Sequence, residues 1–187
     1  MIIDGHAYCW PDLTGGGGFE SPDGLRRHLQ SAIANHHQPA LRVRDRAPGD
    51  NSGLVDLSRR TRLEALKDAD FRWASNGRFE WIDGGVRYFK QYFAPSMQES
   101  FYGPESLVAE MDYAGVDMAL LHRTPYLGID NDFIAECVSR YPDRLRGLAH
   151  VPEWRCVPDP DGSLLELERA VRLGLSGLHF LPPQLNL

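Results

Sequence analysis

The second half of the chain alternates between amphipathic segments and short apolar runs. Apolar residues recur at helical spacing in 104–114 and 130–141, and each of these segments is followed by an apolar run of strand length. Such alternation is typical of a parallel sheet whose strands are joined by helical crossovers. Three strands are predicted here, at 116–122, 145–151 and 177–182.

Local signals predict where two of the helices begin and end. Pro104 stands in the first turn of one helix, and Gly115 follows its last turn. Asp130 is placed to cap the helix that runs to Tyr141, before Pro142. These signals support the helical segments that the apolar spacing predicts.

A further helix is predicted before the last strand. Ser163 and Glu166 have the spacing of a capping box, and Gly174 follows the pattern as a stop. Leu164, Leu167 and Val171 then lie on the face predicted to point inward.

The first hundred residues follow another pattern. An apolar start at 2–8 predicts a buried strand, and a run of four glycines after it predicts a loop. Helical spacing recurs in 21–37, after a Ser-Pro start, and in 54–69 through Leu57, Leu63 and Leu66.

Aromatic and polar residues alternate between Phe71 and Phe93. The dipeptides Asn76-Gly77 and Asp83-Gly84 stand between the runs, as two-residue turns would. This segment predicts a small antiparallel flap, whose aromatic side chains either pack on the rest of the protein or cover a substrate.

Together the four predicted strands form successive βα units. A complete TIM barrel has eight strands and takes about 250 residues. We therefore predict an α/β fold of TIM-barrel-like units, the N-terminal half of a barrel, in one domain over 1–187. A helical and antiparallel insertion follows the first strand, at about 9–103.

Composition excludes several classes of protein. The net charge is −6 and the pI is about 5.6, so we expect no nucleic-acid partner. No stretch approaches the roughly 18 apolar residues of a membrane span, and the three cysteines form no CxxC pair. We expect a cytoplasmic protein with reduced thiols, which acts on a small molecule and forms a homo-oligomer.

Candidate chemistry gathers at the predicted strand ends, where TIM-barrel enzymes place their reactive groups. A single histidine at such a position is more often a core residue than a ligand, but here there is one at or near each strand end. These histidines are His6, His122, His150 and His179.

His6 and Tyr8 have the i, i+2 spacing that points two side chains to one face of a strand, as a metal site requires. Tyrosine titrates near 10 and is an uncommon zinc ligand, which weakens that pair. Arg87 and Arg123 are candidates to bind a substrate carboxylate, although exposed structural arginines are the alternative for both.

Several segments share a residue pattern with one known group of enzymes. They are Ile3-Asp4-Gly5-His6-Ala7-Tyr8, Arg140-Tyr141-Pro142-Asp143-Arg144-Leu145-Arg146-Gly147-Leu148 and Gly177-Leu178-His179. Over these segments the chain resembles amidohydrolase-related proteins, which include aminocarboxymuconate-semialdehyde decarboxylase. The resemblance is strongest over 104–182.

The resemblance implies a divalent metal, often zinc, held by a His-x-His pair on the first strand and by ligands on strands five, six and eight. Of these ligands only His6 matches here, and Tyr8 stands where the second histidine would be. The implied activity is hydrolysis by a metal-bound water or nonoxidative decarboxylation of a carboxylated or cyclic substrate. We expect His150 and His179, with Arg87 and Arg123, to contact that substrate, and this chain alone to lack a complete site.

The alternative is a non-catalytic half-barrel that dimerises or binds a partner. Four parallel strands leave two open sheet edges, which need to be covered.

Overall fold

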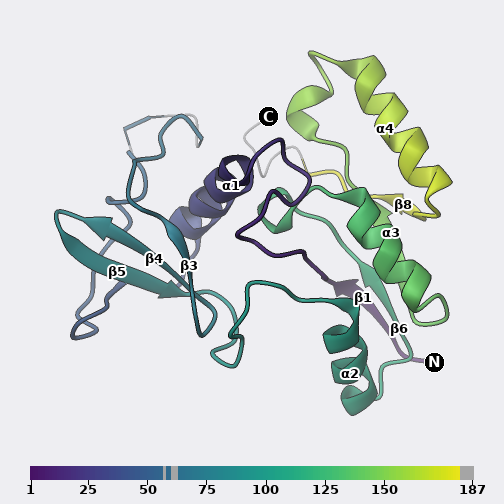
Figure 1. Ribbon diagram of the computed structural model, residues 1–187, viewed down its shortest axis with the longest axis horizontal. Coiled ribbons are helices and arrows are strands. Elements are labelled where there is room, and N and C mark those ends of the chain that lie inside the picture. The colour runs from purple at the N-terminus through teal and green to yellow at the C-terminus, as the bar shows by residue number, and fades with distance from the viewer. Residues whose placement is uncertain (57, 60–62, 182–187) are drawn as a thin grey trace. The chain divides into compact units, whose positions relative to one another are not determined.

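A computed structural model describes residues 1–56, 58–59 and 63–181 and has a mixed α/β fold, which confirms the predicted class (Figure 1). The chain divides into two compact units. The first comprises Met1–Pro11, Gly17–Phe19 and Phe101–Leu187, and the second comprises Asp12–Gly16 and Glu20–Ser100. Among the described helices none is long and apolar enough to cross a membrane.

The first unit contains a four-stranded sheet in the order β1-β6-β7-β8, in which every neighbouring pair is parallel. All four strands were predicted from apolar runs, and each is shorter than its run. The prediction that the first of them is buried was wrong: only Ala7 of that strand is buried and Ile3 is 58% exposed, because among the described strands it has a neighbour on one side only. Their C-terminal ends lie at one edge of the sheet, because parallel strands run in one direction. The strands are β1 (Ile3–Ala7), β6 (Met118–Leu121), β7 (Leu145–Ala149) and β8 (Gly177–Leu178).

Three helices connect these strands, and the predicted signals set the ends of two of them. Helix α2 (Pro104–Ala114) ends at Gly115, whose φ of 72° is the left-handed conformation that glycine adopts without strain. Helix α3 (Asn131–Arg140) begins after Asp130, whose carboxylate accepts hydrogen bonds from the backbone N–H groups of Asp132 and Phe133.

Helix α4 (Pro160–Arg172) differs from the prediction at its start and on its faces. Asp159, not Ser163, is the N-cap, and its carboxylate accepts from the Gly162 N–H. The Asp-Pro signal wins because proline is preorganised for the first helical position and a carboxylate suits a helix N-terminus. Leu164 and Val171, predicted to point inward, are 55% and 62% exposed.

One apolar core joins the sheet to its helices. Strand residues meet one face of each helix there, and the burial of each large aliphatic side chain contributes about 1.5–3 kcal/mol. The core includes Ala7, Leu107, Val108, Met111, Leu121, Ile134, Leu145, Ala149 and Ala170.

The second unit holds helix α1 (Pro22–Asn35) and an antiparallel sheet in the order β2-β5-β4-β3. The predicted antiparallel flap is confirmed, and its buried aromatics Phe79, Trp81 and Phe89 form the core of this unit. The strands are β2 (Leu41–Arg42), β3 (Arg72–Ala74), β4 (Arg78–Asp83) and β5 (Val86–Gln91).

Both predicted turns of the flap need a correction of one residue. Ala74 pairs with Arg78, so Asn76-Gly77 belongs to a three-residue turn. Asp83 pairs with Val86, so the two-residue turn is Gly84-Gly85, both at positive φ. Two adjacent glycines adopt that conformation more readily than an aspartate followed by a glycine.

The helix predicted over 54–69 was wrong for the described residues of that segment. Val55 instead forms an antiparallel bridge with Leu66. The Asp56 carboxylate accepts from the N–H and hydroxyl of Ser58, which satisfies the backbone outside a helix. Residue 57, on which the helical spacing partly depended, lies outside the described residues.

Lys90 is a fully buried cation in the second unit. Its Nζ donates to the carbonyls of Ile33 and His36, both at 2.7 Å, and so closes the C-terminal end of α1. Burial lowers the pKa of Lys90 to about 8. The favourable interaction of a donor with a helix C-terminus offsets part of the cost of burial.

We expect Lys90→Met to destabilise the protein by about 1–3 kcal/mol, because the carbonyls of Ile33 and His36 lose their hydrogen bonds from Nζ. Between the folded pKa of about 8 and the unfolded value of 10.5, the unfolded state binds more protons. The free energy of unfolding of the wild type therefore rises over that range relative to the variant. Urea unfolding of both proteins at several pH values measures the difference, and a difference that does not rise with pH would contradict this role.

Candidate functional site

Four ring side chains meet at the C-terminal edge of the parallel sheet. The His6 and His122 ring centroids lie 4.4 Å apart, and those of His122 and His179 lie 4.8 Å apart. The Tyr8 hydroxyl lies 2.7 Å from His6 Nε2. We call these residues the strand-end cluster: His6, Tyr8, His122 and His179.

The backbone at the strand ends fixes the cluster. The pairing of β1 with β6 shifts register between Asp4 and Ala7, an irregularity of the kind that redirects side chains beside functional sites. The His122 N–H donates to the Ala7 carbonyl, and the His179 N–H donates to the Ala149 carbonyl. These bonds extend the sheet ladder by one step and place both rings at its edge.

Hydrogen bonds assign the neutral form of two of the rings. His122 Nε2 lies 2.8 Å from the Gly5 carbonyl, and because a carbonyl only accepts, Nε2 carries the proton. Nδ1 of His122 is then a lone pair, buried and without a hydrogen-bond partner among the described residues. His179 Nδ1 accepts from the Arg123 N–H, so the proton of the neutral His179 ring is on Nε2.

Burial keeps two members of the cluster uncharged near neutral pH. It raises the pKa of Tyr8, with a smaller contribution from Tyr126. It lowers the pKa of His179, and the neighbouring His122 adds to that effect against the opposing bond from Arg123. Tyr8 is therefore a neutral phenol and His179 a neutral imidazole at pH 7.

These residues do not fit the metal site that the resemblance implies. Tyr8 stands where the implied pair has its second histidine, and tyrosine is an uncommon zinc ligand; the neutral His179 ring has its proton on Nε2 and its Nδ1 bonded to the Arg123 N–H. Within the part of the chain that the structure describes, no group of three His, Cys, Asp or Glu side chains is arranged so that it could hold a metal ion. The prediction of zinc at His6 and Tyr8 stays a prediction.

Arg123 is buried beneath the cluster, at 1% exposure. Its guanidinium donates to the Gly128 carbonyl at 2.7 Å and to the Cys9 carbonyl at 3.5 Å. Burial lowers its pKa to about 10. These contacts hold the loop after β6, and a substrate carboxylate contact by Arg123 stays a prediction.

His150 follows β7 and lies in a buried polar network. Its backbone N–H and carbonyl bond the two ends of the Asn131 side-chain amide. It lines a polar cavity of about 470 Å³ with residues from the first turns of α3 and α4. His150 therefore lines a cavity to which no residue of the strand-end cluster contributes, and substrate contact there stays a prediction.

Sequence reasoning missed Glu153, which is 5% exposed. Its Oε2 lies 3.7 Å from His150 Nε2, and its Oε1 accepts from the Leu181 N–H at 3.0 Å. The carboxylate thus links the turn after β7 to the segment after β8. The signal was an acidic residue three positions after a strand-end histidine.

Arg87 lies on β5, in the second unit. It is exposed and forms a long ion pair with Glu80, at 3.8 Å. Its predicted role in binding a substrate carboxylate is not tested by this geometry.

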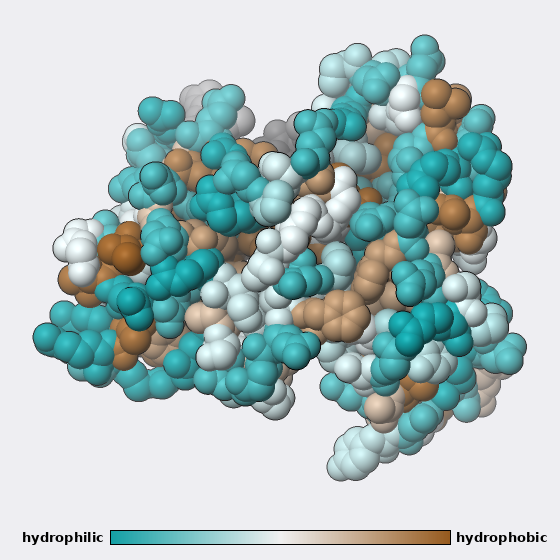
Figure 2. Space-filling model, in the orientation of Figure 1, coloured by the Kyte–Doolittle hydropathy of each residue, from teal (hydrophilic) through white to brown (hydrophobic). Residues whose placement is uncertain are grey.

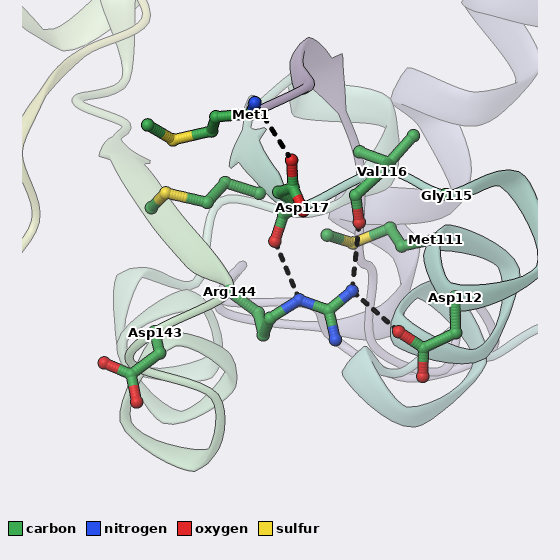
Figure 3. A pocket seen from close by; sticks show the side chains of 9 residues that line it. Met1, Met111, Asp112, Gly115, Val116, Asp117, Asp143 and Arg144 are labelled. Carbon is green, nitrogen blue, oxygen red and sulfur yellow. Dashed lines mark hydrogen bonds and ion pairs between the residues drawn. The ribbon is translucent and has the colours of Figure 1, made fainter.

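A different hollow, of about 780 Å³, lies at the opposite edge of the parallel sheet (Figure 3). There Arg144 donates to the carbonyls of Asp117 and Val116 and pairs with Asp112 at 2.7 Å. The Asp117 carboxylate accepts from the Ile2 N–H at 2.5 Å. These contacts join β1, β6 and β7 at their N-terminal ends, where parallel barrels gain stability rather than catalysis.

Comparison with solved structures finds several similar chains, one of which is described below. No protein-family model matches the chain, and no curated protein matches it. The neighbour is a probable 2-pyrone-4,6-dicarboxylic acid hydrolase from Acinetobacter baumannii, with citric acid bound; it is 23% identical over 47% of this chain, with a TM-score of 0.35. The match spans 29% of that protein, and at that TM-score it assigns neither fold nor activity to this chain.

We expect NMR titration to find His179 with a pKa below its ordinary value of 6.5, and His122 with its neutral-form proton on Nε2. Since the unfolded state binds more protons just below pH 6.5, the contribution of His179 to stability is complete above 6.5 and declines as the pH falls. His179→Gln should remove that decline in unfolding experiments. A pKa of His179 at or above 6.5 would contradict the buried, neutral ring.

Proposed function

We propose that this protein is a hydrolase or nonoxidative decarboxylase of the amidohydrolase kind, acting on a small carboxylated or cyclic organic substrate. The observation that supports the proposal is the convergence of His6, Tyr8, His122 and His179 at the C-terminal edge of a parallel sheet. That edge is where (β/α) barrels carry out their chemistry. In this proposal the first unit is half of such a barrel.

The cluster holds groups of both kinds that acid–base chemistry needs. Nδ1 of His122 is a proton acceptor, and the neutral Tyr8 hydroxyl is a proton donor beside His6. Hydrolysis requires removal of a proton from water and delivery of one to the leaving group. We assign the first role to His122 and the second to the hydrogen-bonded pair of Tyr8 and His6.

Substrate contact is proposed for His179, through the Nε2–H that its bond from Arg123 leaves available. Arg87, Arg123 and His150 remain proposed substrate contacts on the resemblance alone. Zinc has no support besides the resemblance, whose ligand set only His6 matches here, and the acid–base roles above do not depend on a metal.

We expect His122→Gln to lower turnover by a factor of about 10²–10⁴, the usual value of a positioned base. The glutamine amide can still donate to the Gly5 carbonyl, but its oxygen accepts hydrogen bonds without being basic enough to take up a proton in place of Nδ1. Acid release and carbon dioxide release are measured on a panel of carboxylated lactones, esters and aromatic acids. His37→Gln, an exposed histidine of the second unit, is the control. Equal rates for both variants, or no turnover of the panel, would count against the proposal.

A second candidate function is a half-barrel that associates with a copy of itself. Among the described strands, β1 pairs on one side only, with β6, and β8 pairs only with β7. Apolar side chains are exposed near both open edges: Ile2 and Ile3 at about 60%, and Leu165 and Val171 of α4 at 62%. Figure 2 has the orientation of Figure 1, and at the position of α4 it shows apolar surface (brown) among polar atoms.

A two-fold axis parallel to the strands would place β8 of each copy beside β1 of the other. Both seams would then be parallel, and eight strands would close a barrel without open edges. A sheet edge presents unpaired N–H and C=O groups. This pairing would give them hydrogen-bond partners and would also bury the exposed apolar side chains.

We expect the protein to dimerise at micromolar concentration, as measured by light scattering or sedimentation. Leu165→Lys with Val171→Lys should shift it to monomer, because both charges would be buried at the seam. Tyr113→Lys, at a 95% exposed position of α2, is the matched control. A folded monomer of the unmodified protein would contradict this second function.

A further inference from the structure

The antiparallel sheet of the second unit has two unlike faces. Directly opposed residues point to the same side of a sheet, and neighbours along a strand point to opposite sides. Phe79 opposes Lys90, whose Nζ donates to the Ile33 carbonyl of α1. Phe79 itself lines a small hollow together with Leu29 of α1. One face of the sheet is therefore packed on α1.

The other face of the sheet carries arginines. Arg72 and Phe89 both oppose Glu80, so these three side chains share that face. Ile82, two positions further along β4, opposes Arg87, and this pair shares it as well. We call this surface the arginine face. Its arginines, with those of the loop at 42–46 that reaches it, are Arg42, Arg44, Arg46, Arg72, Arg78 and Arg87.

Phe89 lies beneath two of these arginines. The Arg78 guanidinium is 4.5 Å from the centre of the Phe89 ring, and the Arg46 guanidinium is 5.7 Å from it. Arg46 has a φ of 58°, a left-handed conformation that is unfavourable for a residue other than glycine. The loop therefore holds this guanidinium on the face at a cost, and backbone strain of this kind clusters at functional sites.

The arginine face has more guanidiniums than carboxylates. Within the part of the chain that the structure describes, Arg46 and Arg78 form no ion pair, and the Arg78 Nε donates to the neutral Gln91 side chain. Six guanidiniums thus meet three carboxylates, which leaves an excess of positive charge. The ion pairs are those of Asp45 with Arg42 and Arg44, of Glu80 with Arg72 and Arg87, and of Asp70 with Arg72.

Two of the paired arginines are also available to a ligand. Arg44 is 83% exposed and its ion pair is 3.6 Å long, and Arg87 is 55% exposed with an ion pair of 3.8 Å. Such exposed pairs contribute little to stability, so these guanidiniums can bind another carboxylate without a large loss. Both line a hollow of about 430 Å³ with the apolar side chains of Val43 and Ile82, and none of the described residues that line it is acidic.

We propose that the arginine face binds an acidic segment of a partner protein, with carboxylates on the guanidiniums and an apolar side chain in the hollow. Guanidinium forks bind carboxylates bidentately, and the excess of positive charge attracts a segment rich in Asp and Glu.

A single-stranded nucleic acid fits this surface less well. Its bases need exposed rings on which to stack, whereas Phe89 is 2% exposed beneath the arginines. Arg87, given above as a substrate contact on the resemblance alone, is part of the arginine face. The proposal does not rest on the strand-end cluster, because every residue of the face belongs to the second unit.

The probe is a fluorescein-labelled peptide of glutamates with a pair of leucines at its centre. We expect saturable binding by fluorescence anisotropy at low salt, where charges are least screened, with a dissociation constant of about 100 μM or below. The same peptide with glutamine in place of glutamate should bind at least about tenfold more weakly. No saturable binding of the acidic peptide, or tighter binding of an oligothymidylate of equal length, would overturn the proposal.

Variants locate the peptide on the protein. Arg44→Gln with Arg87→Gln should weaken binding at least about tenfold, and both changes replace exposed side chains, so the fold is retained. The matched control is Arg26→Gln with Arg59→Gln, which removes the same charge outside the arginine face: Arg26 is on α1, and Arg59 pairs with Asp56. Peptide binding that is unchanged in the first variant, or weakened equally in the control, would refute the assignment.

Discussion

The first unit depends on parallel pairing of β1, β6, β7 and β8. Parallel strands end at a common edge, so residues far apart in sequence, such as His6 and His179, are brought into one cluster by the ladder itself. The ladder continues one step past β6 and β8, where the backbone N–H groups of His122 and His179 bond to carbonyls of the neighbouring strands. The same bonds that stabilise the sheet therefore orient the rings, and a change in register would disperse the cluster.

Buried cations in both units rely on backbone carbonyls. Arg123 donates to Gly128 and Cys9 beneath the strand-end cluster, and Lys90 donates to Ile33 and His36 at the end of α1. In both cases the carbonyls belong to a loop or a helix end, and that of Ile33 also accepts from the N–H of His36 at the C-cap. Each cation donates hydrogen bonds to these carbonyls. Because each cation is removed from water, its pKa is lowered. Neither side chain was recognisable from the sequence as a buried structural residue, since isolated basic residues are usually solvated.

Local signals were sufficient for most elements of the fold. Apolar runs predicted the four parallel strands. Gly115 and Asp130 marked helix ends because Gly115 adopts the left-handed conformation at the end of α2 and the Asp130 carboxylate accepts from two N–H groups at the start of α3. The helix predicted over 54–69 was wrong because the apolar spacing fits a helix, whereas the Asp56 carboxylate accepts from Ser58 and stabilises a turn there. At the site, strand-end position identified the histidines, but Glu153 escaped because its contact with Leu181 depends on how two loops pack. Tautomers and burial also depend on tertiary neighbours, which no single-sequence pattern contains.

For α4 the apolar spacing predicted the helix correctly, but two of the residues expected to point inward are exposed. Leu164 and Val171 lie seven positions apart, as core residues of a helix do, yet they are more than half exposed, while Ala170 of the same helix is fully buried. A helix of a closed barrel packs on the sheet and also on the helices beside it, so it has apolar residues on two sides. In α4 the sheet side is covered by this unit and the lateral side is not. Among the described residues the exposed stripe and the side of β8 away from β7 are both uncovered, so one neighbour with an apolar face and a strand edge would cover both.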